Sequence, residues 1–126
     1  MGYVADIEDR ARLNSRFREV LATGPHSQVV VMSIPPGEDI GAEVHETVDQ
    51  VLVIVSGEGA AILDGERTPI GPGWLVQVPA GTHHDLVNTG ATDLRLYTVY
   101  APPQHAPGTV HGTKADAEAA EAGETG

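Results

Sequence analysis

The middle of the chain alternates between short apolar runs and short polar breaks. Between residues 28 and 101, runs rich in Val, Ile and Leu are each closed by Gly, Pro, Asn or Asp; they read QVVVMSI, DQVLVIVSG, EGAAIL, WLVQVP, THHDLV and LRLYTVYAPP. Runs of this length bounded by turn residues are typical of strands. The pattern therefore predicts eight or nine strands and an all-β sandwich or barrel, not a parallel sheet with crossover helices.

One of the breaks carries a specific turn signal. Asp64 and Gly65 separate two of the short runs. An Asp-Gly pair is favoured in two-residue hairpins because both positions need a positive φ. We therefore expect a β-hairpin centred on these residues.

The two ends of the chain have weaker patterns. LNSRFREVL carries apolar residues at helical spacing, but FREVLATGPHSQVVV also reads as two strands around a Gly-Pro turn. We expect a short helix near residues 7–12 and then a strand. The acidic, alanine-rich end, KADAEAAEAGETG, lacks an apolar stripe and is expected to be a frayed helix or disordered. The expected organisation is an N-terminal helix and strand segment (1–27), a barrel (28–101) and an acidic C-terminal extension (102–126).

Composition narrows the function classes. A chain of 126 residues fits one domain, and the absence of cysteine excludes disulfides, thiolate metal sites and cysteine nucleophiles. The net charge of −11 repels phosphate backbones and anionic lipid, so we expect no nucleic-acid and no membrane partner. The charged N-terminus does not fit a signal peptide and no run is long enough to span a bilayer, which leads us to expect a cytoplasmic protein.

Polar residues recur at two informative spacings. The first set combines two glycines with three potential metal ligands: Gly37, Glu43, His45, Gln50 and Gly57. The second set combines turn residues with one histidine and one amide: Gly73, Pro79, Gly81, His84 and Asn88. Because residues two apart point to the same side of a strand, Glu43 and His45 should project together.

These two sets resemble the paired motifs of the cupin superfamily. The second, GWLVQVPAGTHHDLVN, matches at every position, whereas the first has Glu43 in place of the usual His and Gln50 in place of the usual Glu. Nearly the whole chain resembles small single-domain cupins of the mannose-6-phosphate isomerase-like type, although Glu46 stands where that type commonly has Pro. The resemblance implies a cupin jelly-roll β-barrel that holds one divalent metal ion through Glu43, His45, Gln50 and His84.

The substituted ligand types affect which metal is expected. The set keeps one negative charge, as in a common cupin site with three histidines and one carboxylate. Two imidazoles with two oxygen donors favour harder ions, so Mn(II) or Fe(II) ranks ahead of Ni(II), Co(II) and Zn(II). Gln50 could instead hydrogen-bond a ligand or water, and Glu43 could be an ordinary strand-edge charge. Asp49 competes with Gln50, although its side chain should face the other way.

Other residues are candidates for the pocket. His26 is the candidate proton carrier, with Glu43 as the other catalytic group, because an unperturbed histidine titrates near neutral pH. His83 should face solvent, opposite His84. The residues expected to line the substrate pocket are Gln28, Met32, Tyr100 and His105. Those expected in the core are Met32, Trp74, Tyr97 and Tyr100.

Three functions fit this reading. The first is a dioxygenase-like oxidoreductase acting on a small organic molecule that chelates the metal through oxygen atoms. The second is a non-redox isomerase or lyase that uses the metal as a Lewis acid, and the third is a non-catalytic sugar or small-molecule sensor. We also expect a homodimer, formed through the strand near residues 17–21, because an uncovered strand edge favours pairing.

Overall fold

The computed structural model describes residues 2–125 of the chain, with side chains as far as residue 121. Its elements, in chain order, are α1 (Ile7–Leu13), β1 (Arg18–Thr23), β2 (Gln28–Ile34), β3 (Asp49–Ser56), β4 (Gly59–Leu63), β5 (Glu66–Ile70), β6 (Leu75–Val78), β7 (His84–Asn88), β8 (Leu94–Ala101), β9 (Val110–His111) and α2 (Lys114–Thr125). All the predicted strands are present, and the fold class is confirmed as mostly β with antiparallel pairing.

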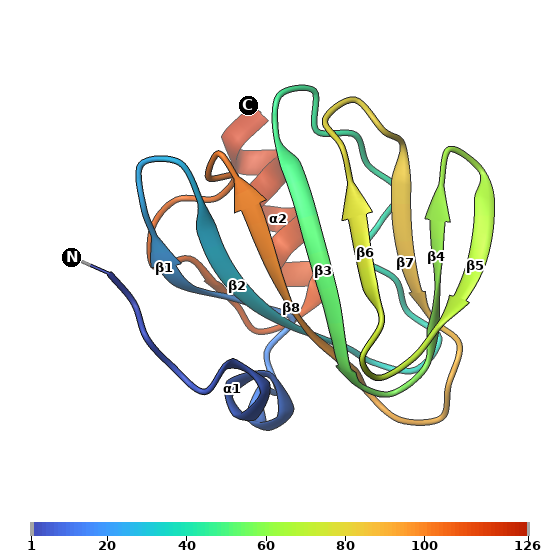
Figure 1. The fold of residues 1–126 in the computed structure, drawn as a ribbon. Coiled ribbons are helices and arrows are strands. Elements are labelled where there is room, and N and C mark those ends of the chain that lie inside the picture. Colours follow the sequence, from blue (N-terminus) through green and yellow to red (C-terminus); the bar gives the residue numbers. More distant parts are fainter. Residues whose placement is uncertain (1, 126) are drawn as a thin grey trace.

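Two antiparallel sheets face each other, as in a jelly roll (Figure 1). The larger has the strand order β6-β3-β8-β2-β1-β9, and the smaller has the order β5-β4-β7. The segment leading to β3 lies along β7, where isolated bridges join Asp39 to Val87 and Glu43 to His84. That segment brings residues from the long β2–β3 connection into the smaller sheet.

The alternation seen in the sequence determines which side chains form the core. Along β8, Leu94, Leu96, Thr98 and Tyr100 are buried, and the residues between them are half-buried. Each pairs across to a buried residue of β2, which places the apolar side chains of both strands on the inner face. Polar residues occupy that face mainly near one end, where Gln28, Tyr100 and Gln50 pair side by side across β2, β8 and β3.

The predicted hairpin at Asp64 and Gly65 is confirmed. The two residues connect β4 to β5 and have φ values of 48° and 83°. A second glycine, Gly57, has both a positive φ and no room for a side chain. Its φ is 87°, and a Cβ atom there would lie 2.5 Å from the carbonyl oxygen of Asp93. The last glycine of the first motif therefore allows the β3–β4 turn to pack against the start of β8.

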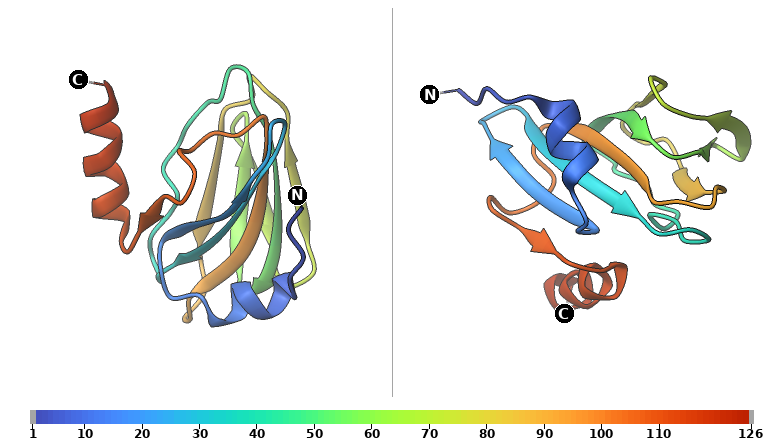
Figure 2. Two further views of the ribbon diagram at one scale, coloured as in Figure 1. Left: turned by 90° about the vertical axis from the view of Figure 1, so that its left-hand side faces the viewer. Right: turned by 90° about the horizontal axis from the view of Figure 1, so that it is seen from below.

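Helices α1 and α2 lie on opposite sides of the sandwich (Figure 2). Asp6 caps α1 by accepting from the Asp9 amide, and Arg95 on β8 donates to the Arg12 carbonyl at 2.8 Å. The predicted helix near residues 7–12 and the strand after it are thus both present. No helix among the described residues is long and apolar enough to cross a membrane.

The Lys114–Thr125 part of the C-terminal extension forms helix α2. Lys114 at the start of α2 pairs with Asp39, and Ala117 is buried in the core. Glu121, one turn further on, lies 3.7 Å from the guanidinium of Arg18. These contacts fix α2 beside the β2–β3 connection and β1.

Trp74 is not in the core, which corrects the expectation from the sequence. It is 52% exposed, because it precedes β6 at the outer edge of the larger sheet. Tyr97 is half-buried on the outer face of β8, whereas Met32 and Tyr100 are each 1% exposed and belong to the core as expected.

Candidate metal centre

Three predicted ligands come together at one end of the sandwich. The ligand atoms of Glu43, His45 and His84 all lie within 4.8 Å of one another. The nearest carboxylate oxygen of Glu43 is 3.6 Å from Nε2 of His45 and 3.9 Å from Nε2 of His84. Residues separated by about forty positions in the sequence therefore form one cluster.

The backbone explains why these side chains meet. Glu43 and His84 exchange two backbone hydrogen bonds of 2.9 Å, which places their side chains next to each other. Gly81 donates its amide to the carbonyl of His45 at 2.8 Å, with a positive φ of 85° that suits glycine. The turn that begins at Pro79 thus links the second motif to the first.

His84 is held in the orientation that a ligand needs. Its Nδ1 lies 3.0 Å from the carbonyl oxygen of Thr82. A carbonyl only accepts, so Nδ1 is the donor, and in the neutral ring the lone pair is on Nε2. Nε2 is buried, has no hydrogen-bond partner and faces the cluster. A backbone partner on the opposite ring nitrogen is the usual support for a metal-binding histidine.

Gln50 also offers a buried donor atom with no hydrogen-bond partner, in this case its side-chain oxygen. The side chain is 1% exposed, and its Nε2 donates to Thr98 Oγ1 at 3.1 Å. The amide oxygen Oε1 is buried with no hydrogen-bond partner. Asp49, the competing carboxylate, is exposed and accepts from the Ala80 amide, so it faces away as predicted.

The charge of Glu43 is stabilised within the cluster. Burial alone would raise the pKa of the Glu43 carboxyl, but the imidazoles of His45 and His84, with help from Arg18, outweigh burial and lower it below its usual value. Glu43 is therefore an anionic donor over a wide pH range.

Two of the predicted pocket residues lie next to the cluster. The ring of Tyr100 is 6.0 Å from that of His45, and the ring of His105 is 5.1 Å from that of Tyr100, both edge-on. Burial lowers the pKa of His105 to about 4, and the nearby charge of Arg18 adds to this effect. His105 is accordingly neutral near pH 7.

Gln28 supports His105 and is not itself a free pocket group. Its Oε1 accepts from the amides of Gln104 and His105, and its Nε2 donates to the His105 carbonyl at 2.7 Å. These bonds fix the loop that follows β8 across the end of β2. Met32 lies two residues beyond Val30 on the inner face and packs in the apolar core.

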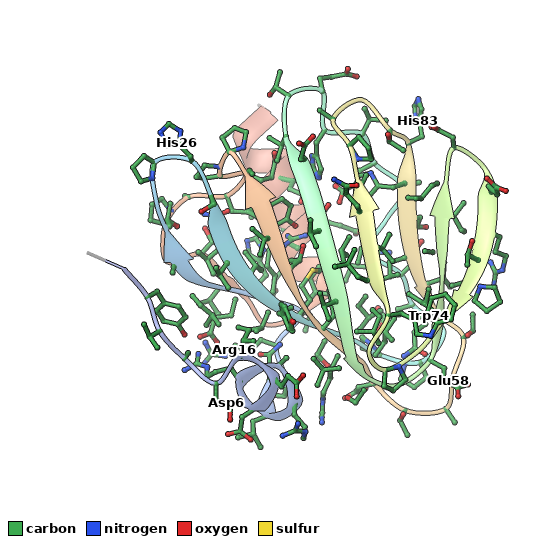
Figure 3. The ribbon with its side chains drawn as sticks, in the orientation of Figure 1. Asp6, Arg16, His26, Glu58, Trp74 and His83 are labelled. Atoms are coloured by element: carbon green, nitrogen blue, oxygen red, sulfur yellow. The ribbon has the colours of Figure 1, made fainter. Side chains whose placement is uncertain are left out.

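The structure does not bring His26 to the cluster. It is exposed on the turn between β1 and β2 (Figure 3), where Gly24 donates to the Ser27 carbonyl. The physical reason is that this tight turn ends before the strand becomes buried at Gln28. His26 is therefore not part of the cluster, and its role as a proton carrier stays a prediction, whereas His83 is exposed as expected.

Sequence reasoning missed Arg18. This residue is only 3% exposed although it is charged, and its Nη1 lies 3.3 Å from Nδ1 of His111. The available signal was the alternation of β1, since Arg18 shares the inward side of the strand with Val20.

Unpaired buried polar atoms gather around Tyr100. Among the described residues, six buried side-chain atoms lack a hydrogen-bond partner: Arg18 Nε, His45 Nε2, Gln50 Oε1, His84 Nε2, Arg95 Nε and His105 Nε2. All except that of Arg95 belong to side chains of the cluster or the neighbours of Tyr100. Because buried polar groups are nearly always satisfied, such a concentration indicates a site built for a ligand.

The donor set fits a divalent metal. Bonds of about 2.0–2.2 Å to a common ion separate neighbouring donors by roughly 3.0–3.5 Å. The separations are 3.6 and 3.9 Å from Glu43 to the two imidazoles and at most 4.8 Å within the cluster, so the three side chains would move inward to bind one ion. One carboxylate, two neutral imidazole nitrogens and one amide oxygen form a suitable set for such an ion.

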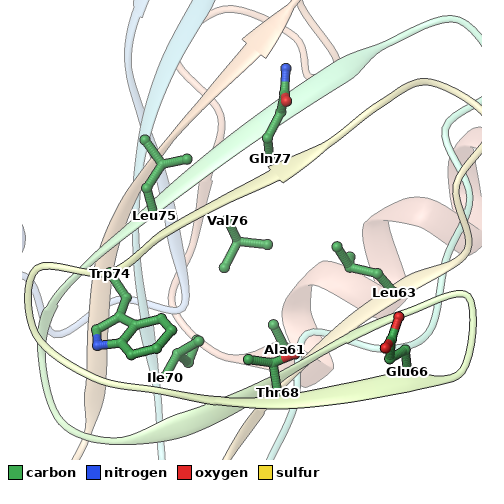
Figure 4. A pocket seen from close by; sticks show the side chains of 9 residues that line it. All are labelled: Ala61, Leu63, Glu66, Thr68, Ile70, Trp74, Leu75, Val76 and Gln77. Carbon is green, nitrogen blue, oxygen red and sulfur yellow. The ribbon is translucent and has the colours of Figure 1, made fainter.

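One cleft of the surface reaches the cluster, and a second lies away from it. One of about 430 Å³ reaches Glu43 and His84 from the side of Val44, Ile62 and Asp85. Another of about 220 Å³ lies between β5 and β6 (Figure 4) and is lined mainly by apolar side chains, namely Ala61, Leu63, Glu66, Thr68, Ile70, Trp74, Leu75, Val76 and Gln77. The second cleft contains none of the candidate ligands.

A jelly roll with histidine and carboxylate ligands at one end defines the cupin class. Comparison with known families agrees: residues 30–100 match the cupin domain, and the chain belongs to this family. It is 46% identical to the uncharacterized protein YrkC of Bacillus subtilis over 125 residues, which cover 94% of this chain and 67% of that protein.

A solved structure and a named relative extend the comparison. The crystal structure of BH2720 from Bacillus halodurans has a TM-score of 0.93 and 43% identity, covering 94% of this chain and 95% of that one. An oxalate-binding protein of Thermotoga maritima is 35% identical over 68 residues, which are 54% of this chain and 56% of that protein. The resemblance to the cupin superfamily is thus confirmed, whereas the mannose-6-phosphate isomerase-like type stays a prediction.

Proposed function

We propose that this protein is a metal-dependent enzyme acting on a small organic molecule that carries oxygen donors. Glu43, His45, His84 and Gln50 would hold one divalent ion, with Mn(II) or Fe(II) preferred. The observation that carries the proposal is the convergence of the Glu43 carboxylate with buried, unpaired Nε2 atoms of His45 and His84.

The residues of the chain have separate roles in this proposal. The ligand set supplies a Lewis-acidic centre when the ion is bound, and an ion held by four protein donors keeps positions for substrate. Tyr100, whose pKa is raised to about 12 by burial, remains a neutral hydroxyl that can donate to a substrate oxygen. His105 is neutral and positioned by Gln28. It replaces His26 as the candidate group for accepting a proton.

The metal proposal is tested by elemental analysis of protein purified without added metal. We expect about one transition-metal ion per chain in the wild type and little in His84→Ala and His45→Ala. His83→Ala is the matched control, because His83 is the exposed neighbour of His84, and it should retain full occupancy. Full occupancy in His84→Ala would contradict the assignment.

The reaction type is tested separately. A dioxygenase-like oxidoreductase should consume oxygen when Fe(II)- or Mn(II)-loaded protein is given small chelating substrates. Oxygen uptake at background across such a panel would remove this version. The name of the Thermotoga maritima relative favours a second candidate, a non-catalytic binding module for a small oxygen-rich molecule. That candidate predicts ligand binding by calorimetry with no turnover.

We also propose that the protein forms a homodimer through β1. Its outer edge pairs with β9 at Arg18 and Glu19, and the Val20 amide donates to the Thr109 carbonyl, so among the described residues only positions 21–23 lack a strand partner on that edge. Open edges favour pairing with another chain. Light scattering after size exclusion should give twice the chain mass, and the chain mass at all concentrations would contradict the proposal.

A further inference from the structure

Arg18 is a buried cation with unused hydrogen-bonding capacity. It begins β1 and is 3% exposed, with Nη1 3.3 Å from His111 Nδ1 and 3.7 Å from a carboxylate oxygen of Glu121. Its Nε is buried and has no hydrogen-bond partner. A buried guanidinium is costly unless its N–H groups meet acceptors, so this arrangement indicates an anion-binding position.

Arg18 lies on the inward face of the larger sheet, the face that also carries Tyr100 and Gln50. Although burial raises the pKa of Tyr100, a side-chain interaction with Arg18 opposes that rise. Arg18 also helps to lower the pKa of Glu43 and of His105 through its charge. Together with the inward position of Arg18, these effects indicate that its charge acts on Glu43 and on the pair formed by Tyr100 and His105.

The unpaired atoms around Tyr100 divide into two groups of different chemistry. Those of His45, His84 and Gln50 are lone-pair donors suited to a cation. That of Arg18 is an N–H donor, which suits an anion, and that of His105 is a neutral ring nitrogen beside it. One ligand that meets both groups needs an anionic end and a metal-binding end.

We propose that Arg18 anchors a carboxylate group of the substrate, so that the protein binds small carboxylic acids whose other oxygen atoms reach the metal. The proposal rests on the proposed function, since it takes the ion at Glu43, His45 and His84 as one end of the site. A guanidinium presents a planar pair of N–H donors that matches a carboxylate. With a divalent ion bound, positive charge in this interior exceeds the single charge of Glu43, which favours an anionic ligand.

Glu121 gives the site a built-in competitor. Its carboxylate, on α2, lies near Nη1 of Arg18 and is half-exposed. A substrate carboxylate that binds the guanidinium has to share or displace this ion pair. Removing the charge of Glu121 should therefore strengthen binding, the opposite direction to removing Arg18.

The test measures binding of oxalate and of imidazole to Mn(II)-loaded protein by calorimetry. Oxalate offers a carboxylate to Arg18 and oxygen donors to the metal, whereas imidazole binds the metal alone. For Arg18→Gln we expect at least a tenfold loss of oxalate affinity, imidazole affinity within twofold of wild type, and full Mn(II) occupancy. Arg18→Lys should lose less. Arg16→Gln is the matched control, because Arg16 is exposed and pairs with Glu19.

The opposite variant keeps the test decisive if Arg18→Gln does not fold. Glu121 is half-exposed, so Glu121→Gln should fold normally. The Glu121→Gln protein should bind oxalate two- to fivefold more tightly than the wild type. Unchanged oxalate affinity in Glu121→Gln or in folded Arg18→Gln would overturn the proposal, as would equal losses for oxalate and imidazole. Inorganic phosphate that binds wild type more tightly than oxalate, and does so through Arg18, would overturn the carboxylate assignment.

Failure of the proposed function would be visible separately. Wild-type protein that holds no metal would refute the metal centre. Oxalate would then be titrated into the metal-free protein. Binding that disappears in Arg18→Gln would still support the anion site, and no binding would overturn it.

Discussion

The side-chain amide of Gln50 donates to the Thr98 hydroxyl at 3.1 Å and leaves its own oxygen buried without a hydrogen-bond partner. Both residues lie on the inner face, on neighbouring strands of the larger sheet. Thr98 therefore orients the amide so that the oxygen, and not the nitrogen, is available to a ligand. In the proposed metal site, an amide held in this way would be a neutral replacement for the carboxylate usual at this cupin position.

Replacing Gln50 should change metal affinity in a direction set by the new group. Gln50→Leu removes the oxygen donor, and we expect affinity for Mn(II) to fall by about 10- to 100-fold. Gln50→Glu adds a negative charge to the ligand set and should raise affinity by about tenfold near pH 7. Competition with a fluorescent chelator measures both constants.

A neighbouring variant controls for general effects of mutation in this strand. Asp49→Asn alters a carboxylate that is exposed and bonded to the Ala80 amide. It should leave Mn(II) affinity within twofold of wild type. Equal affinity in Gln50→Leu and Asp49→Asn would show that Gln50 does not bind the ion directly.

Metal removal should lower thermal stability through linkage. A ligand at a hundred times its dissociation constant stabilises the native state by about 2.7 kcal/mol, provided it does not bind the unfolded chain. We expect excess chelator to lower the Tm of metal-loaded wild type by several degrees and to leave that of His84→Ala unchanged. A chelator effect of the same size in both proteins would contradict a metal site that depends on His84.

Much of the fold was predictable because short-range signals determine it. Alternation along β3 and β8 gave the inward faces, and Asp64 with Gly65 gave a hairpin of the expected type. Exposure of Trp74 was not predictable, since no local pattern shows that β6 lies at the edge of its sheet. The helical state of the tail depends on tertiary contacts, such as that of Lys114 with Asp39.

The site was predictable only in part for a similar reason. The resemblance of the spacing to the cupin motifs gave Glu43, His45 and His84, because such motifs reflect how the strands pair. The roles of Gln28 and Arg18 depend on partners about 77 and 93 positions away along the chain, His105 and His111. No pattern within one strand reveals such partners. The exposure of His26 likewise depends on the direction of the turn between β1 and β2, which no local sequence pattern indicates.

Substitution of Gly57 should destabilise the protein more than substitution of another positive-φ glycine. Gly57→Ala combines an unfavourable φ of 87° with a Cβ placed 2.5 Å from the Asp93 carbonyl oxygen. Gly65→Ala has a similar φ of 83° but nothing within 4 Å. We expect losses of about 1–2 kcal/mol for Gly65→Ala and at least about 1 kcal/mol more for Gly57→Ala, measured by urea unfolding. Equal losses would mean that the turn relaxes to relieve the clash.

The buried imidazole of His105 should make stability depend on pH in the mildly acidic range. Its pKa falls from 6.5 to about 4 on folding, chiefly because burial disfavours the charged form. Below pH 6.5 the unfolded chain takes up a proton that the folded protein refuses. His105 therefore does not reduce the free energy of unfolding above pH 6.5. As the pH falls from 6.5 toward 4, its burial lowers the free energy of unfolding progressively.

His105→Phe should abolish this pH dependence of the stability while keeping the edge-on contact with Tyr100. For metal-free protein, the wild type should lose about 1 kcal/mol more unfolding free energy than the variant between pH 7 and pH 5, a figure reduced for the partial exposure of the ring. Urea unfolding at the two pH values measures both losses. Identical losses in the two proteins would mean that His105 titrates normally and is open to solvent, which would also remove it as a neutral group of the pocket.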